Sequence, residues 1–154
     1  MCKQTVSDVC NFMDKAIEYA KLSSKENPID VPVGCVIVKD GQIISYGFNS
    51  RESQNIITGH AEIEAIENAE KLLGDRRLSG CKMFVTLEPC PMCAGAIRAA
   101  QIDELYFGAY NLRDGAAGTV YNLLYPYVKV FGGIKKSDCE PLLENFFKNL
   151  RSNK

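Results

Sequence analysis

The sequence predicts an α/β protein of three layers, α/β/α, in which helices cover both faces of a mixed five-stranded sheet. Segments with apolar residues at helical spacing alternate with short runs typical of strands, and such alternation favours a sheet covered by helices. The first two strand-like runs follow each other directly, which adds a hairpin to the sheet. With 154 residues, of which 46% are hydrophobic, the chain can bury a proper core. We therefore expect a single domain over residues 1–154.

The first elements are a helix and a hairpin. Apolar residues recur at helical spacing from about Ser7 to Leu22, which predicts an amphipathic helix. Residues 33–39 and 42–49 are rich in β-branched and aromatic side chains, and both are expected to form strands. Asp40-Gly41 between them is a typical tight turn of a hairpin.

A second helix is expected over residues 60–73, and it should end near Gly74, since glycine commonly terminates helices. The charged residues of this segment fall mostly on one face. The opposite face is apolar and is expected to pack on the sheet; it consists of Ala65, Ile66, Ala69, Leu72 and Leu73.

The second half of the chain continues the alternation. Strands are expected over 82–87, 104–109 and 128–131, and a helix over 91–100, where Pro91 suits the first turn. A final helix is indicated by an apolar stripe of Cys139, Leu142, Leu143, Phe146, Phe147 and Leu150.

Cys90 and Cys93 form a C-x-x-C motif between an expected strand and an expected helix. The start of a helix stabilises a thiolate, which serves a metal site and a redox dithiol equally well. A thioredoxin-like dithiol is one interpretation. A structural zinc site would need four protein ligands, and no second pair of close cysteines exists. The remaining cysteines occur singly, with Cys35 and Cys139 on expected core faces; they are Cys2, Cys10, Cys35, Cys81 and Cys139.

His60 is the only histidine of the chain and begins the second helix. Taken alone, such a residue is more often hydrogen-bonded in the fold than a ligand. Together with Cys90 and Cys93, it would complete three ligands of a tetrahedral zinc and leave the fourth position to water, as in catalytic sites. Glu62 can reach the same site only from the first helical turn. It is a candidate proton carrier, and the alternative is a solvated residue on an acidic helix face.

"HAE" (60–62) and "PCPMC" (89–93) match the H-x-E…P-C-x-x-C signature of zinc-dependent nucleobase deaminases. With "VPVGCVIVKDGQIISYGFN", "FVTLEPCPMCAGAI" and "YFGAYNLRDGAAGT", the chain resembles the cytidine/nucleobase deaminase superfamily, and within it the bacterial tRNA-specific adenosine deaminases. This resemblance implies a cytidine deaminase-like fold. It also implies hydrolysis of an amidine C–N bond with release of ammonia, and one Zn²⁺ per subunit held by His60, Cys90 and Cys93. Glu62 would be the proton shuttle.

The resemblance also implies a tRNA anticodon loop as partner, inosine at the wobble position as product, and a homodimer. Asn49 would hold the base, and Asn111 would meet the anticodon backbone. For Lys148 and Arg151 the alternative is a solvated helix end. The implied substrate contacts are Asn49, Ala61, Pro89, Asn111, Phe147, Lys148 and Arg151.

Composition narrows the remaining classes of function. A formal net charge of −1 gives no broad positive surface for nucleic acid. No apolar run is long enough for a membrane span, and the first residues lack the apolar core of a signal peptide. Seven cysteines, an odd number, indicate reduced thiols or metal binding rather than a disulfide framework. We therefore expect a cytoplasmic protein.

Three hypotheses remain. The first is deamination of adenosine in tRNA. The second is deamination of a free nucleobase or nucleoside, such as guanine, cytosine or a related heterocycle, by the same zinc chemistry. The third is a non-catalytic metal protein or dithiol redox protein; in its redox form it predicts no stoichiometric zinc.

Overall fold

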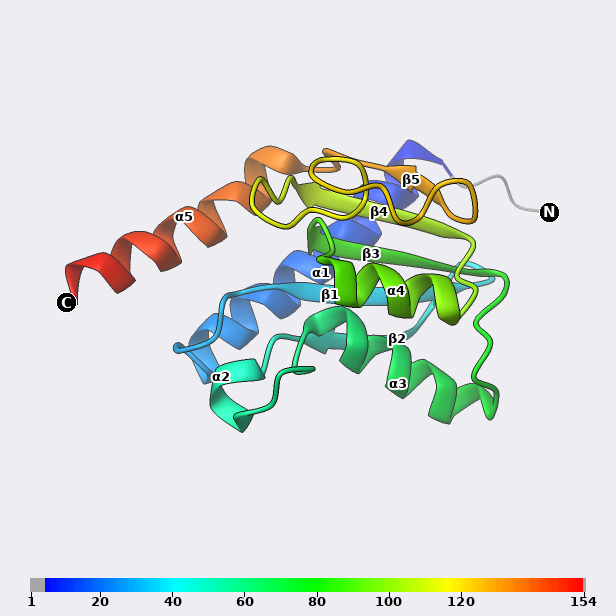
Figure 1. Cartoon of the computed structure of the whole chain (residues 1–154), viewed down its shortest axis with the longest axis horizontal. Coiled ribbons are helices and arrows are strands. Elements are labelled where there is room, and N and C mark those ends of the chain that lie inside the picture. Colours follow the sequence, from blue (N-terminus) through cyan, green and yellow to red (C-terminus); the bar gives the residue numbers. More distant parts are fainter. Residues whose placement is uncertain (1–4, 154) are drawn as a thin grey trace.

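The computed structural model describes residues 5–153, so Cys2 lies outside the described residues. Its sheet has the strand order β2-β1-β3-β4-β5. β1 is antiparallel to both β2 and β3, whereas β3, β4 and β5 are parallel. The elements, shown in Figure 1, are α1 (Val6–Glu26), β1 (Gly34–Lys39), β2 (Gln42–Phe48), α2 (Arg51–Gln54), α3 (Ala61–Leu73), β3 (Cys81–Leu87), α4 (Pro91–Ala99), β4 (Glu104–Ala109), β5 (Lys129–Phe131) and α5 (Lys136–Ser152).

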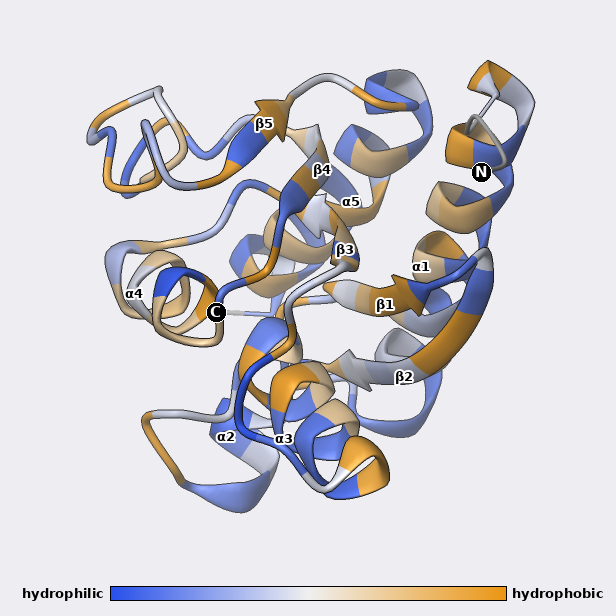
Figure 2. Ribbon diagram, turned by 90° about the vertical axis from the view of Figure 1, so that its right-hand side faces the viewer, coloured by the Kyte–Doolittle hydropathy of each residue, from blue (hydrophilic) through white to orange (hydrophobic). Residues whose placement is uncertain are grey.

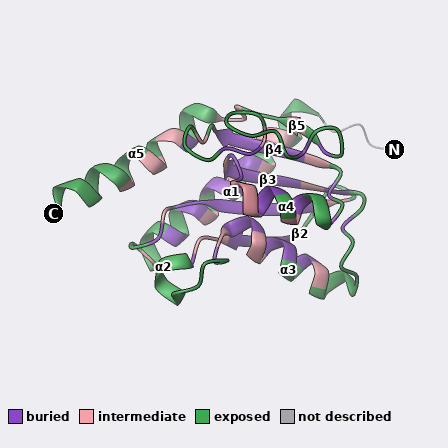
Figure 3. Ribbon diagram, viewed as in Figure 1, coloured by how far each residue is buried: buried purple, intermediate pink, exposed green. Residues whose placement is uncertain are grey.

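Helices cover both faces of this sheet, which confirms the predicted three-layer fold. Side chains of a strand alternate between its two faces. In β1, Val36 and Val38 pack in one cluster with α1, while Cys35 and Ile37 pack in a second cluster with α3 and α4. β1 is therefore hydrophobic along most of its length (Figure 2) and buried like the other inner strands, β3 and β4 (Figure 3).

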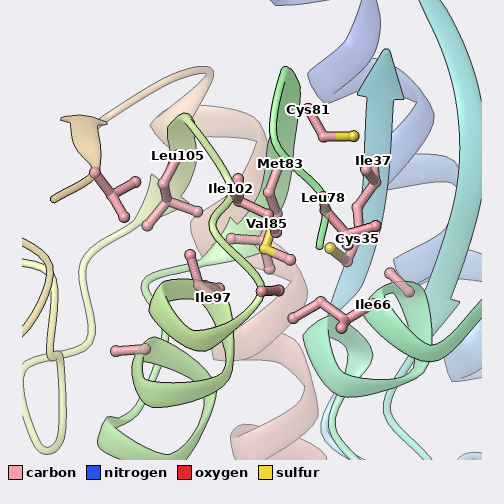
Figure 4. Packing of buried hydrophobic residues seen from close by; sticks show 14 of the residues in the cluster. Cys35, Ile37, Ile66, Leu78, Cys81, Met83, Val85, Ile97, Ile102 and Leu105 are labelled. Atoms are coloured by element: carbon pink, nitrogen blue, oxygen red, sulfur yellow. The ribbon is translucent and has the colours of Figure 1, made fainter. Parts of the chain in front are cut away.

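The larger cluster lies between the sheet and the helices α3 and α4. Figure 4 shows Ile66 of α3 and Ile97 of α4 beside strand residues such as Ile37 and Val85. Cys35 lies in this cluster without solvent exposure, and burial raises the pKa of its thiol well above the usual value. Cys35 is thus a core residue, as predicted.

The start of α1 lies within one residue of the prediction, whereas its end, four residues beyond Leu22, and one additional helix were not predicted. α1 begins after Thr5, whose hydroxyl accepts a hydrogen bond from the Asp8 amide, while the Asp8 carboxylate accepts one from the Thr5 amide. This capping box starts the helix earlier than the apolar pattern indicates. The short helix α2 has no apolar periodicity. It is held by Asp30, whose Oδ1 accepts hydrogen bonds from the amides of Glu52 and Ser53.

The final helix is longer than its buried part. Cys139 is buried against β4, where Gly108 leaves room for its sulfur. Phe147 and Leu150 belong to the same predicted stripe but are exposed, because the C-terminal half of α5 extends past the end of the sheet (Figure 1). Leu72 and Leu73, at the end of α3, were expected to pack on the sheet and are likewise exposed, because they lie in the last turn of the helix. Among the described residues, no helix has the length and hydropathy that a membrane crossing requires.

Candidate metal centre and active site

The starts of two helices bring together the only histidine and the C-x-x-C motif. His60 is the N-terminal cap of α3, Cys90 is the cap of α4, and Cys93 lies in the first turn of α4. The His60 Nδ1 atom lies 3.6 Å from the Cys90 sulfur and 3.4 Å from the Cys93 sulfur. The three candidate ligand atoms all lie within 4.8 Å of one another.

This donor set fits zinc. A tetrahedral zinc bound at about 2.3 Å to sulfur and about 2.0 Å to nitrogen separates the two atoms by about 3.5 Å. The separations of 3.6 and 3.4 Å match that value. Three protein ligands leave one position for water, which is the arrangement of a catalytic zinc.

The hydrogen bonds between the two cysteines shift the pKa values of their thiols in opposite directions. A hydrogen bond with the Cys93 thiol, assisted by one with His60, lowers the pKa of Cys90 to about 4 against the opposing effect of burial. The same hydrogen bond with Cys90, together with burial, raises the pKa of Cys93. The hydrogen bond between the two sulfurs thus favours the thiolate at Cys90, and a bound cation would favour loss of the Cys93 proton as well.

Glu62 lies in the first turn of α3 and is only 4% exposed, so it does not belong to a solvated acidic face. Burial raises the pKa of its carboxyl, and the nearby charge of His60 partly offsets this effect. Its side chain also interacts with Cys93. A buried carboxyl with a raised pKa beside candidate metal ligands is suited to accepting and returning a proton.

Asn49 follows β2 and is tied to the start of α3. Its side-chain oxygen accepts a hydrogen bond of 2.9 Å from the amide of Ala61. The backbone N–H of Ala61, expected to lie near substrate, is therefore engaged by Asn49. Since Ala61 directly follows His60, this hydrogen bond also fixes the position of that candidate metal ligand.

A cavity of about 490 Å³ opens beside His60 and Cys90. Three of the residues expected to contact substrate line it, namely Asn49, Asn111 and Phe147. Lys148 and Arg151 are exposed on α5 and are not part of its lining. The remaining lining residues are Asp30, Val31, Arg51, Glu52, Leu87, Tyr110, Leu112, Arg113, Asp114 and Leu143.

Pro89 is buried rather than open to this cavity, and its carbonyl accepts a hydrogen bond from the amide of Ala116. Residues 110–114, by contrast, form one wall of the cavity, although only Asn111 was expected at the site. One signal in the sequence could have indicated them. They directly follow β4, which is parallel to β3, so they leave the sheet at the same edge as Cys90.

Two cysteines and a histidine at the starts of two helices, on an α/β/α fold, define a zinc-dependent hydrolytic deaminase. The chain belongs to the family of the cytidine and deoxycytidylate deaminase zinc-binding region, whose model matches residues 6–109. Membership of a zinc-binding family argues against the dithiol redox hypothesis.

Known proteins similar to this chain include tRNA-specific adenosine deaminases and a guanine deaminase. The tRNA-specific adenosine deaminase of Bacillus subtilis (strain 168) is 38% identical over 148 residues, which cover 93% of this chain and 91% of the relative. A solved structure from studies of A-to-I editing by tRNA:A34 deaminases at the wobble position has a TM-score of 0.81 and 37% identity, covering 86% of this chain and 99% of that one. The guanine deaminase of Bacillus subtilis has a TM-score of 0.64 and 38% identity, covering 71% and 69%.

Proposed function

We propose that the chain converts adenosine to inosine at the wobble position of a tRNA anticodon loop and releases ammonia. The observation that carries this proposal is the extent of the similarity. The likeness to a tRNA-specific adenosine deaminase spans more than nine tenths of both chains, whereas the likeness to a guanine deaminase spans about seven tenths.

The residues of the site suit this reaction. His60, Cys90 and Cys93 would hold one zinc, which lowers the pKa of water to about 7 when bound and so supplies the nucleophile. Glu62 would take one proton from the water and give it to the ring nitrogen. It would then take the second proton, from the hydroxyl that has added to the ring carbon, and give it to the amine, which leaves as ammonia. Asn49 holds the base through its amide nitrogen, because its oxygen is already bonded to Ala61.

The mouth of the cavity is suited to single-stranded RNA despite the net charge of the chain. Tyr110 and Phe147 line the cavity and are each 43% exposed, so nucleotides beside the adenosine can stack on them. Arg113 lines the same cavity, and Lys148 and Arg151 follow along α5. These cations are placed to contact the RNA phosphates.

We also propose that the enzyme is a cytoplasmic homodimer. Residues 120–127 expose several large apolar side chains, and a second copy of the chain would cover such a surface. All cysteines among residues 5–153 are free thiols, which suits a reducing compartment. Light scattering on the eluting protein tests the dimer, and Tyr125→Asp should shift it toward monomer. The exposed apolar residues are Val120, Tyr121, Leu123, Tyr125 and Tyr127.

The substrate is tested by incubating zinc-loaded protein with a tRNA that carries adenosine at the wobble position, and separately with free bases and nucleosides. Products are identified by mass spectrometry. We expect inosine in the tRNA and no turnover of free bases. Turnover of guanine or cytosine with unmodified tRNA would refute the proposed substrate while retaining the chemistry.

The role of Glu62 is tested by Glu62→Gln. Turnover should fall by about 10²- to 10⁴-fold, the usual contribution of a positioned acid or base, while zinc content and melting temperature stay unchanged. The matched control is Glu67→Gln, the same change on the exposed face of α3, which should retain full activity. Wild-type turnover in Glu62→Gln would show that another group carries the proton.

A further inference from the structure

A second buried carboxylate lies beside the metal site but takes no part in the chemistry described above. Glu88 follows the last residue of β3, is 1% exposed, and precedes Cys90 by two residues. Its backbone amide donates a hydrogen bond of 2.9 Å to the carbonyl of Ala109, at the end of β4. The position of Glu88 is thus fixed by the sheet.

The Glu88 side chain accepts four hydrogen bonds, all of them from the loop that follows β4. Oε1 accepts from the amide of Asn111 at 3.2 Å and from the hydroxyl of Thr119. Oε2 accepts from the amides of Ala117 at 3.0 Å and Thr119 at 3.2 Å. A buried carboxylate is costly unless it is hydrogen-bonded in this way. The loop 111–119 is therefore folded around one acceptor group.

The loop also packs closely on this carboxylate. A Cβ atom added to Gly115 would lie 2.6 Å from the Glu88 carboxyl carbon and 2.5 Å from the carbonyl oxygen of Asn111. The amide of Ala116 donates a 2.8 Å hydrogen bond to the carbonyl of Pro89. Glu88 and Pro89 thus connect the loop directly to the segment that carries Cys90.

The beginning of the same loop forms a wall of the candidate substrate cavity. Asn111, Arg113 and Asp114 line that cavity. The side-chain oxygen of Asn111 accepts hydrogen bonds from the amides of Arg113 and Asp114, at 3.3 and 3.0 Å. The hydrogen bond from the Asn111 amide to Glu88 therefore determines where this part of the wall lies.

We propose that Glu88 is a positioning residue for the substrate: its carboxylate holds the cavity wall 111–114 at a fixed place relative to the metal ligand Cys90. The proposal deepens the proposed function and rests on it, since that wall would meet the RNA. Glu88 acts on substrate binding through the wall and does not touch the reacting atoms.

The substitution Glu88→Gln tests this role because of how the four donors are arranged. An amide offers one oxygen acceptor and one NH₂ donor. If the NH₂ of glutamine takes the Oε1 position, its oxygen at the Oε2 position still accepts hydrogen bonds from the amides of Ala117 and Thr119. The Thr119 hydroxyl can turn and accept a hydrogen bond from the NH₂. Only the amide of Asn111 then faces another donor. The loss therefore falls on the cavity wall rather than on the whole loop.

Kinetics on the tRNA substrate form the first arm of the experiment. For Glu88→Gln we expect KM to rise about 10- to 100-fold, the equivalent of one hydrogen bond to a charged group, with kcat within about threefold and zinc content unchanged. The control is Glu104→Gln, the same change at the start of β4, where the carboxylate accepts from Tyr106; its KM should equal that of the wild type. A fall in kcat or zinc content with unchanged KM overturns the proposal.

Hydrogen exchange forms the second arm and needs no substrate. In Glu88→Gln, the amides of Asn111, Arg113 and Asp114 should exchange faster, while those of Ala117 and Thr119 should keep their protection. Uniform loss of protection over 111–119, or no change, overturns the proposal. If wild-type protein fails to edit tRNA but this pattern holds, only the proposed substrate is wrong.

Gly115→Ala provides an independent variant should Glu88→Gln not fold. It keeps the carboxylate and displaces the loop from it, since the new Cβ has no space. KM should again rise about tenfold with zinc retained, and an unchanged KM would also overturn the proposal.

Discussion

Gly47 of β2 allows the first turn of α3 to lie directly on the sheet. A Cβ atom at this position would be 2.3 Å from the carbonyl oxygen of Ala61 and 2.8 Å from the amide nitrogen of Ala65. Ala61 is the residue after the candidate ligand His60. The substitution Gly47→Ala should therefore disturb both the packing and the metal site.

The size of the effect follows from these distances. Ordinary van der Waals contact begins at 3.4 Å, so the start of α3 must move by about 1 Å. Overpacking of this kind costs about 1–3 kcal/mol of stability. A displacement of about 1 Å at reacting groups can cost about 100-fold in rate. We expect the free energy of unfolding of Gly47→Ala to be about 2 kcal/mol lower than that of the wild type. Its turnover per bound zinc should fall by up to about 100-fold.

Urea unfolding, zinc content and turnover of the zinc-loaded protein measure these effects. Gly95→Ala is the matched control, because Gly95 is exposed in α4 and a Cβ there meets no atom within 4 Å. The free energy of unfolding of Gly95→Ala should rise by about 0.5–1 kcal/mol because alanine has the better helix propensity, and its turnover should not change. If Gly47→Ala retained both its unfolding midpoint and its turnover, the contact between β2 and α3 would not be what positions His60.

Three further predictions concern single side chains. Cys90→Ala should lose zinc and turnover, because two protein ligands remain; full zinc occupancy by elemental analysis would mean that the ligand set is incorrect. Asn49→Ala leaves the amide of Ala61 without its acceptor, so the free energy of unfolding should fall by about 1–3 kcal/mol. An unchanged midpoint of urea unfolding would contradict this expectation. Burial raises the pKa of Cys139 to about 12, whereas a thiol in the unfolded chain has a pKa of about 8.5. The neutral thiol therefore contributes its full stability below about pH 8.5. This contribution is lost as the pH rises toward 12, because only the unfolded chain then ionises readily. Stability should then fall by up to about 1.4 kcal/mol per pH unit, and Cys139→Ala should reduce this slope when unfolding is followed between pH 8 and 10.

Local patterns in the sequence predicted most elements because their causes are local. β4 was predicted over 104–109 and forms Glu104–Ala109. The hairpin of β1 and β2 turns at Asp40 and Gly41, which both adopt positive φ. α2 was missed for the opposite reason. The acceptor that holds its first amides belongs to Asp30, more than 20 residues earlier in the chain, and no local pattern reports such a contact.

The candidate site shows the same division. The residue types and spacing of His60, Cys90 and Cys93 are enough to indicate a metal. For Glu62, the same residue pattern is compatible with a buried acid and with a solvated one. The fold buries Glu62 and brings its side chain to Cys93 of α4, about 30 residues later in the chain.

The ligand set, the order of helices and strands, and the family can all be read along the chain, because residue types and periodicity act over a few neighbours. What surrounds the ligands depends on the tertiary structure. β3 and β4 are parallel neighbours, so Glu88 and the loop 111–119 emerge at one edge of the sheet. Their hydrogen bonds join segments about 30 residues apart and place a cavity wall beside the metal ligands. Such a contact depends on strand order, which no short stretch of the chain encodes.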